Sequence, residues 1–551
     1  MQSCPGGEVV SANGLAQIER RRAYDRHVGC VSPLWGKGSR VMVTEDQSGV
    51  VAFLGSPAVH GGAAVERLDT HASIVFLAGD RALKLKRAVR YDYLDYSTAA
   101  HRKVMCDAEL RINRRTAPAL YRAVVAVTRQ ADGALAIGGP GTPVDWLVEM
   151  RRFEQSALLD RLAEAGLLSL ELMRPLAYTI ARFHAAAAAR VNHGGWDALT
   201  RVIDGNAAGF GREGAGVLDP AQCARLTTRA RFVLRGCGDL ADRRRDAGRV
   251  RHCHGDLHLS NIVVLDGEPT LFDAIEFNDD FSCVDVLYDL AFLLMDLWRL
   301  ELPHHANVIW NGYLADTGDL DGLPLMPLFL SCRAAVVAKT TATAANLQAD
   351  ADRRLELQVL ARRYLDLANT LLEPAPPRLI AIGGPSGSGK STTARGIAPC
   401  LGAAPGAVVL RSDEIRKTLC GVKPLDRLGP EGYTPEVSQR VYATLLARAD
   451  TVVRGGYTAI ADAVFGRLAD RDAIQHVAAA AGVPFTGLWL EAPEKVLRSR
   501  VAGRDPDASD AGVDEIRRQL AAPPDSLCWH RLDASCSRQH VCDEVGKLVP
   551  S

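Results

Sequence analysis

A glycine-rich segment in the last third of the chain carries residue types that bind phosphate. It fits the pattern G-x-x-x-x-G-K-[ST], in which glycines let the backbone N–H groups face phosphate oxygens. The start of the following helix adds the positive end of its dipole. We expect Lys390 to reach the β- and γ-phosphates of a nucleotide and Ser391 to ligate Mg²⁺. The expected nucleotide-binding residues are Gly384, Pro385, Ser386, Gly387, Ser388, Gly389, Lys390, Ser391 and Thr392. A chance glycine turn is the alternative.

Two acids follow predicted strands in the same region. Asp413 comes after the strand expected at 407–410, and Asp462 comes after the one at 458–461. The carboxyl ends of parallel strands face the ligand, so Asp413 is predicted to orient or deprotonate an acceptor hydroxyl. Asp462 suits Mg²⁺ or its bound water, and Arg416 suits a charged acceptor. Helix capping is the alternative role for both acids.

An arginine-rich segment follows the last predicted strand. Arg500 and Arg504 are four residues apart and therefore lie on one side of a helix, and Arg498 precedes them. Arginines on a closing segment neutralise the charge that spreads over a transferred phosphoryl group. We expect Arg500 and Arg504 to act in this way, with a solvated basic helix face as the alternative.

A second constellation lies near the middle of the chain. Asp256 precedes Asn261 by five residues, and Asp273 follows that amide by twelve. Phosphoryl transfer to a hydroxyl needs a carboxylate to accept the proton, and an amide and a carboxylate to hold Mg²⁺. We expect Asp256 to be the base and Asn261 and Asp273 the metal ligands, with a hairpin over 262–272 bringing the ligands together. A zinc site at the crowded residues His252, Cys253, His254 and His258 is the alternative.

The segment around Asp256 resembles the catalytic and metal loops of the aminoglycoside phosphotransferase family, relatives of protein kinases and choline kinases. The resemblance implies that Lys86 contacts the α- and β-phosphates and that Glu109 is its ion-pair partner, although Lys84 shares the face of Lys86. It also implies a hinge strand for adenine at 146–150 and a structural helix at 285–291. The loop that would cover the nucleotide, 69–73, is short and lacks glycine, which leaves open a degenerate kinase fold used for binding or regulation.

Residues 378–545 resemble small-molecule P-loop kinases of the gluconate-kinase, shikimate-kinase and zeta-toxin type. Residues 60–545 as a whole resemble bacterial bifunctional aminoglycoside phosphotransferase/ATP-binding proteins. The resemblance implies ATP and Mg²⁺, with GTP as an alternative nucleotide in the N-terminal domain, and a small-molecule acceptor with a hydroxyl. A nucleotide-binding sensor and a toxin-like nucleotide-sugar kinase are the alternatives.

Periodic segments place these residues in two domains. An arm over 1–50 precedes an α+β kinase-like domain over 51–372, with a hairpin at 73–89 and a helix at 99–115. A proline-rich linker over 373–377 stops the last helix. Strands then alternate with helices over 378–551, which predicts an α/β P-loop kinase domain with a parallel sheet, its strands at 379–382, 407–410, 458–461 and 485–490.

The composition is that of an ordinary folded protein. The 551 residues include 65 basic and 65 acidic side chains, 47% apolar residues and 24% charged residues, which argues against nucleic acid or anionic membrane as a general partner. We see no secretory signal and no apolar run of about 18 residues. The 13 cysteines include no C-x-x-C pair. We therefore expect a cytoplasmic protein with reduced thiols.

Overall fold

The computed structural model describes residues 42–549 apart from 92, 424, 504–507, 511 and 522–525. The chain forms two compact units. The first comprises the chain up to residue 168 together with residues 259–278, and the second comprises residues 169–258 and 279 onward. The chain therefore leaves the first unit, returns to it for one hairpin and leaves it again. The predicted domain boundaries stay a prediction.

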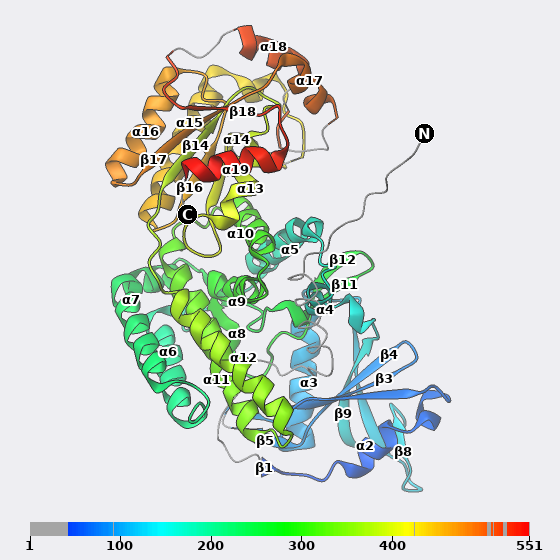
Figure 1. The fold of residues 1–551 in the computed structure, drawn as a ribbon. Helices are drawn as coiled ribbons and strands as arrows, with labels where there is room; N and C mark the ends of the chain where they lie inside the picture. The colour runs from blue at the N-terminus through cyan, green and yellow to red at the C-terminus, as the bar shows by residue number, and fades with distance from the viewer. Residues whose placement is uncertain are drawn as a thin grey trace, which may run out of the picture. The chain divides into compact units, whose positions relative to one another are not determined.

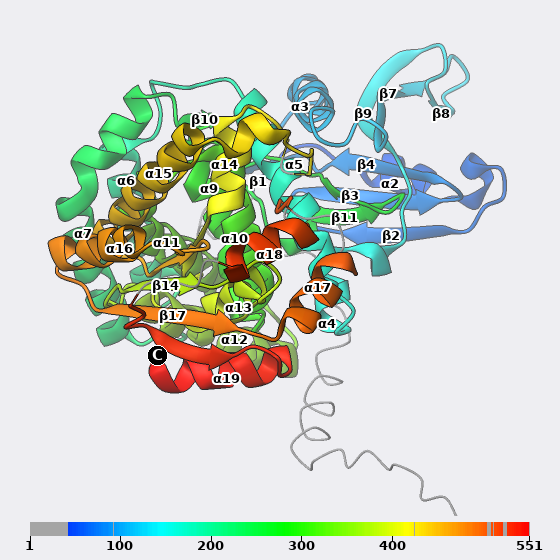
Figure 2. The same cartoon turned by 90° about the horizontal axis from the view of Figure 1, so that it is seen from above.

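The first unit is built on a six-stranded antiparallel sheet. Its strand order is β2-β3-β4-β9-β7-β8, and helix α3 (Ala99–Asn113) lies beside β9 and β7 (Figure 2). The predicted hairpin forms, since Ser73 pairs with Lys86 and Ala78 with Arg81. The strands are β2 (Val65–Asp69), β3 (Ser73–Ala78), β4 (Arg81–Lys86), β7 (Tyr121–Arg129), β8 (Leu135–Ile137) and β9 (Thr142–Arg151).

Residues 42–50 belong to this fold although the sequence assigns them to the arm. Thr44 N donates to Ala88 O, and the side chain of Gln47 donates to Lys86 O and Asp145 Oδ2. Residues 1–41 of the arm lie outside the described residues. The smaller elements of the unit are β1 (Met42–Val43), α2 (Ser48–Leu54), η1 (Pro57–His60), β5 (Val89–Tyr91), β6 (Leu94–Asp95), η2 (Gln155–Ala157), α4 (Leu159–Glu164), η4 (Leu259–Asn261), β11 (Ile262–Leu265) and β12 (Glu268–Leu271).

The second unit begins with a mainly helical region. One segment, 323–347, is apolar and long enough to span a membrane, but 83% of its most apolar window is buried inside the structure, as in a core helix. The elements are η3 (Leu170–Leu172), α5 (Met173–Ala186), α6 (Gly195–Arg212), α7 (Pro220–Asp246), β10 (Val250–His252), α8 (Asp279–Ser282), β13 (Cys283–Asp285), α9 (Val286–Arg299), α10 (Pro303–Thr317), η5 (Leu323–Leu325), α11 (Met326–Leu347) and α12 (Ala351–Thr370).

The same unit ends in a five-stranded parallel sheet of order β15-β16-β14-β17-β18. The four predicted strands form, as β14 (Leu379–Gly383), β15 (Val408–Arg411), β16 (Ala459–Asp462) and β17 (Phe485–Glu491). The edge strand β18 (His530–Asp533) was not predicted, because its pattern is short and mostly polar. The helical elements around the sheet are α13 (Lys390–Ile397), η6 (Ala398–Cys400), α14 (Ser412–Leu419), η7 (Pro430–Tyr433), α15 (Pro435–Arg454), α16 (Leu468–Ala481), α17 (Glu494–Ala502), α18 (Val513–Ala521) and α19 (Arg538–Leu548).

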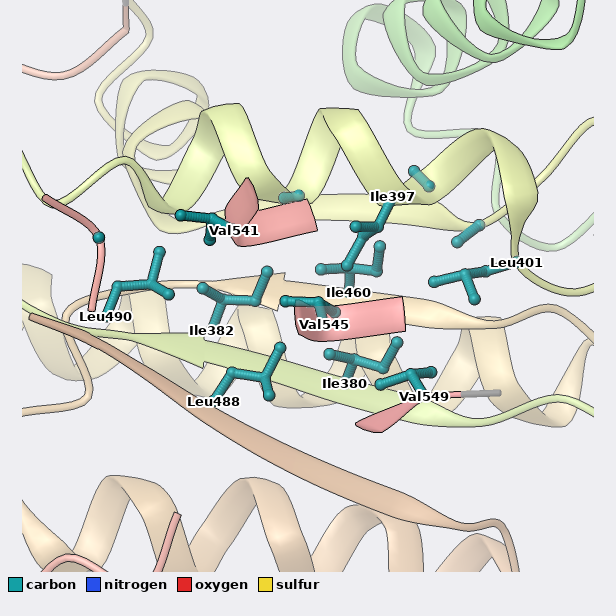
Figure 3. Packing of buried hydrophobic residues seen from close by; sticks show 14 residues of the cluster. Ile380, Ile382, Ile397, Leu401, Ile460, Leu488, Leu490, Val541, Val545 and Val549 are labelled. Carbon is teal, nitrogen blue, oxygen red and sulfur yellow. The ribbon is translucent and has the colours of Figure 1, made fainter. Parts of the chain in front are cut away.

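Helices α13 and α19 cover one face of this sheet (Figure 1). Figure 3 shows Val541 and Val545 of α19 gathered with Ile397 of α13 and with Ile380 and Ile382 of β14. These side chains are all at least nine-tenths buried, and removing such apolar surface from water stabilises the fold by roughly 25 cal/mol per Å². The core therefore fixes the start of α13 at the end of β14.

Helix α10 joins the helical region to the parallel sheet. Asn307 Nδ2 donates to Pro405 O (3.0 Å) and Ala407 O (3.2 Å). Asn311 pairs with the same edge, since its Nδ2 donates to Ala407 O (3.1 Å) and its Oδ1 accepts from Val409 N (2.7 Å). The two asparagines thus satisfy backbone groups of the open edge strand, which would otherwise be unpaired.

Candidate functional site

The glycine-rich loop connects β14 to α13. Gly384, Gly387 and Gly389 have φ angles of 134°, 82° and 92°, which other residues rarely adopt. Two of the three also lie against backbone, because an added Cβ would sit 2.4 Å from Leu490 O at Gly384 and 2.7 Å from Leu497 O at Gly387. The curled loop predicted from the sequence is present in the structure.

Lys390 and Ser391 stand at the first turn of α13. Lys390 Nζ donates to Gly384 O and Pro385 O, both at 3.0 Å, so the ammonium lies over the loop. Ser391 Oγ donates to Asp462 Oδ2 at 2.5 Å. A hydroxyl and a carboxylate side by side form the hard oxygen donor set that Mg²⁺ prefers, so these two residues fit the ion.

The strand ends bring further charges to the same edge. Arg411 ends β15 in register with Asp462 at the end of β16. Arg411 is buried, its Nη1 donates to Glu414 Oε1 at 2.9 Å, and its Nε lies 3.5 Å from Asp462 Oδ2. No role is predicted for Arg411 from the sequence, although a charged residue at the end of a buried strand is a usable signal.

Asp413 lies in the first turn of α14. Arg411 is the N-cap residue of this helix and no side chain caps it, so the capping alternative for Asp413 is not what the structure shows. Burial raises the pKa of Asp413, and nearby Asp462 adds to this, while Arg411 and Lys390 act in the opposite direction. A carboxyl with a raised pKa beside the phosphate loop can accept a proton from a hydroxyl at less acidic pH than an ordinary aspartate.

Arg416 lies one turn after Asp413 and is 9% exposed. Its guanidinium lies 4.8 Å from the centre of the Tyr433 ring, and its Nη1 donates to Gly432 O at 2.8 Å. Among the described residues it forms no ion pair, and its buried Nε has no hydrogen-bond partner. Burying a cation without a carboxylate is costly, which leaves Arg416 suited to an anionic group.

The helices after β17 pack on the phosphate loop. Leu497 O and Val501 of α17 lie against Gly387, and the side chain of Gln519 in α18 accepts a hydrogen bond from Ser386 N at 2.7 Å. Gln519 is not predicted as a site residue, because a lone glutamine on an amphipathic helix carries no signal of its own. Arg500 lies on α17, partly exposed, and Arg504 lies outside the described residues.

The first unit holds a network of lysines and acids. Lys86 Nζ donates to Glu109 Oε2 (2.6 Å) and Glu276 Oε1 (2.5 Å), whereas Lys84 Nζ donates to Glu109 Oε1 (2.9 Å) and Asp273 Oδ1 (2.5 Å). The Lys86 side chain is 1% exposed and that of Lys84 is 14% exposed. Burial would raise the pKa of Glu109, but the two ammonium groups outweigh it and lower the pKa. The implied Lys86–Glu109 pair is present, and Glu109 also pairs with Lys84.

The hairpin predicted over 262–272 forms in this unit. Ile262 pairs with Leu271, and Phe272 N donates to Asn261 O at 3.0 Å, so the chain brings the two predicted metal ligands to the same end of the hairpin. Asp273 has a φ of 60°, and its N–H donates to Tyr121 Oη. Such a backbone conformation is costly for a residue with a side chain and is typical of functional turns.

Asp256 belongs to the second unit. Its Oδ2 lies 3.3 Å from His258 Nε2, and attraction from His258, His254 and Arg333 outweighs burial and lowers its pKa. Asp289 holds this loop in place, since its carboxylate accepts from the backbone N–H groups of His254 (3.1 Å) and Gly255 (2.8 Å).

The predicted structural role of the 285–291 helix has a physical basis in these hydrogen bonds. For the zinc alternative, Cys253 is the one predicted ligand that lies in a group of possible metal donors among the described residues, and its neighbours in that group are His184 and Asp289. Because Asp289 and His184 already bond to each other at 3.1 Å, this cluster is accounted for by hydrogen bonding.

Comparison with known proteins agrees with the C-terminal architecture. Residues 379–523 match the family model described as "AAA domain". Over 478 residues the chain is 29% identical to uncharacterized proteins of Mycobacterium bovis and Mycobacterium tuberculosis, covering 86% of this chain and 92% of each relative. The C-terminal region therefore has a P-loop nucleotide-binding fold.

Several solved kinases are also similar to parts of the chain. The Mycobacterium tuberculosis APS kinase CysC in complex with AMPPNP and APS is 21% identical, with a TM-score of 0.24, covering 32% of this chain and all of that chain. A choline/ethanolamine kinase family protein from Mesorhizobium loti is 15% identical, with a TM-score of 0.33, covering 58% of this chain and 98% of that one. These likenesses do not assign an activity to the protein.

Proposed function

We propose that the C-terminal region transfers the γ-phosphoryl group of ATP to a hydroxyl of a small molecule. The observation that carries the proposal is the convergence of Lys390, Ser391, Asp462 and Asp413 at the carboxyl edge of one parallel sheet. Lys390 and the loop amides would bind the phosphates, and Ser391 and Asp462 would hold Mg²⁺, which supplies neutralisation of the phosphate charge.

The roles of the remaining groups follow from their positions. Asp413 would orient the acceptor hydroxyl and accept its proton while the oxygen attacks the γ-phosphorus and the bond to the departing ADP breaks. Arg416 would bind an anionic group of the acceptor, because it is buried over Tyr433 without a carboxylate partner among the described residues. Arg500 and Arg504 stay candidates for the closing segment. Catalysis would rest on positioning and charge neutralisation rather than on a covalent intermediate.

A screen for phosphorylation with radiolabelled ATP and a panel of hydroxylated metabolites tests this proposal on the full chain. Acceptors with a carboxylate or phosphate should be labelled in preference to neutral ones, and labelling should disappear in Asp413→Asn. Nucleotide binding without transfer to any acceptor would instead support a nucleotide sensor.

The lysine–acid network favours a second candidate activity, phosphoryl transfer by the N-terminal region. We propose Lys84 as the phosphate-binding lysine, because it keeps some exposure and contacts Asp273, whereas Lys86 is enclosed by Glu109 and Glu276. The role of Asp256 as base and the roles of Asn261 and Asp273 as Mg²⁺ ligands stay predictions from the sequence. The turn after β2 is tight, with Thr70 N donating to Ser73 O, so the nucleotide would lack a covering loop there. Loss of one of two activities in Asp256→Asn tests this assignment.

A further inference from the structure

A side chain of α18 accepts a hydrogen bond from a backbone N–H group of the phosphate loop. Gln519 Oε1 accepts from Ser386 N at 2.7 Å, and Ser386 is only 8% exposed. The amides of such loops otherwise face phosphate oxygens. The carbonyl oxygen of Gln519 therefore satisfies this donor in the way that a phosphate oxygen would.

The orientation of the Gln519 amide is fixed by its own helix. Its Nε2 donates to Glu515 Oε1 at 2.8 Å, one turn earlier on α18. Because the nitrogen is held by that carboxylate, the oxygen is the atom that faces the loop. The contact is thus directional and does not depend on packing alone.

The segment before α18 is anchored at the acceptor side of the site. Asp510 pairs with Lys417 Nζ at 2.7 Å and accepts from Tyr433 Oη at 2.9 Å and Leu428 N at 3.1 Å. The Lys417 side chain is 2% exposed, so this ion pair is shielded from water and salt. The chain therefore reaches α18 from a fixed point beside α14.

We propose that Gln519 is a cap of the phosphate loop that competes with nucleotide. It holds the Ser386 amide until a phosphate oxygen replaces it, and α18 remains nearby through the Asp510 anchor. The cap satisfies a buried donor in the nucleotide-free protein and lowers the affinity for nucleotide by the strength of one hydrogen bond. This inference rests on the proposed nucleotide binding at the loop.

Calorimetric titration of the full chain with MgATP tests the cap. Gln519→Ala removes the competing oxygen, and we expect about three- to tenfold tighter binding, the value of one neutral hydrogen bond. Gln519→Glu places an anion where phosphate must bind and should bind several-fold more weakly than the wild type. The matched control is Gln539→Ala in α19, whose side chain also bonds to a carboxylate one turn away, and it should leave the affinity unchanged.

Hydrogen exchange of the loop gives a second readout. In the nucleotide-free protein the Ser386 amide should exchange faster in Gln519→Ala than in the wild type, and saturating MgATP should abolish the difference. If Gln519→Ala binds MgATP as strongly as the wild type or more weakly, the cap is wrong, whereas the proposed nucleotide binding at the loop still holds. If the wild type itself binds no MgATP, the proposed function falls, and the cap falls with it.

Discussion

The contact between α10 and the edge of the parallel sheet predicts that the helical region and the P-loop region unfold together. Asn311→Ala is the perturbation that tests this. The substitution removes both the acceptor of Val409 N–H and one donor to Ala407 O. It leaves the apolar surroundings of the helix in place.

The magnitude follows from the groups left behind. An unsatisfied, partly buried Val409 N–H costs about 1–3 kcal/mol, and the lost bond to Ala407 O about 0.5–1.5 kcal/mol. Ala407 O keeps a second donor in Asn307, which limits the second cost. Alanine gains about 0.5 kcal/mol of helix propensity over asparagine. We therefore expect a loss of about 1–3 kcal/mol in the free energy of unfolding.

Urea unfolding of the full chain measures this loss. Asn369→Ala is the matched control, because Asn369 is also a partly buried helix residue and its Nδ2 donates to Leu365 O of its own helix. The control should change the free energy of unfolding by less than about 0.5 kcal/mol. Two results would refute the reasoning: equal losses in both variants, or a transition in Asn311→Ala that affects the P-loop region alone.

Four further substitutions test other parts of the account. Asp413→Asn should lower the rate of phosphoryl transfer by about 10²- to 10⁴-fold. Because burial raises the pKa of Asp413, the folded protein holds this proton more tightly than the unfolded chain. The free energy of unfolding therefore falls as pH rises from the pKa of an unfolded aspartate through the raised pKa of Asp413. Asp413→Asn should be more resistant to urea than the wild type at neutral pH, and a less stable variant would contradict this. Lys86→Ala should lower the free energy of unfolding by about 3–5 kcal/mol, because it leaves the Glu276 carboxylate without its ion-pair partner and Glu109 with Lys84 alone. Lys84→Ala should cause a smaller loss in thermal unfolding, and the reverse order would exchange the roles of the two lysines. Asp289→Ala removes the acceptor of the backbone N–H groups of His254 and Gly255. In urea unfolding it should lower the free energy of unfolding by about 1–3 kcal/mol for each group, and an unchanged free energy would show that water replaces the carboxylate.

The sequence predicts the phosphate-loop region well because its signals are local. The spacing of Gly384, Gly389, Lys390 and Ser391 lies within one turn and one helix start, and the alternation of strands and helices requires a parallel sheet. The position of Asp462 follows from the same rule. The strand order confirms the parallel sheet, and a hydrogen bond joins Ser391 to Asp462 at its edge. The roles of these residues in binding stay predictions.

Other features depend on contacts between distant segments and could not be predicted. Lys84 and Lys86 are two residues apart and share one face of their strand, so the sequence does not distinguish them. Their different partners, Asp273 for Lys84 and Glu276 for Lys86, are seen only in the structure. The Gln519 contact spans 133 residues and the Asn311 contact spans 98 residues, and neither involves a residue type that signals binding. The role of such polar side chains depends on the backbone groups to which they hydrogen-bond, and these are known only from the structure.

Nucleotide binding at the glycine-rich loop is the central claim, and calorimetric titration with MgATP measures it directly. The wild type should bind MgATP, and Lys390→Ala should bind at least about tenfold more weakly, because it loses a charge-assisted contact to phosphate. Lys547→Ala, which removes an exposed lysine from α19, should bind like the wild type. Binding of equal strength by Lys390→Ala and the wild type would contradict the account.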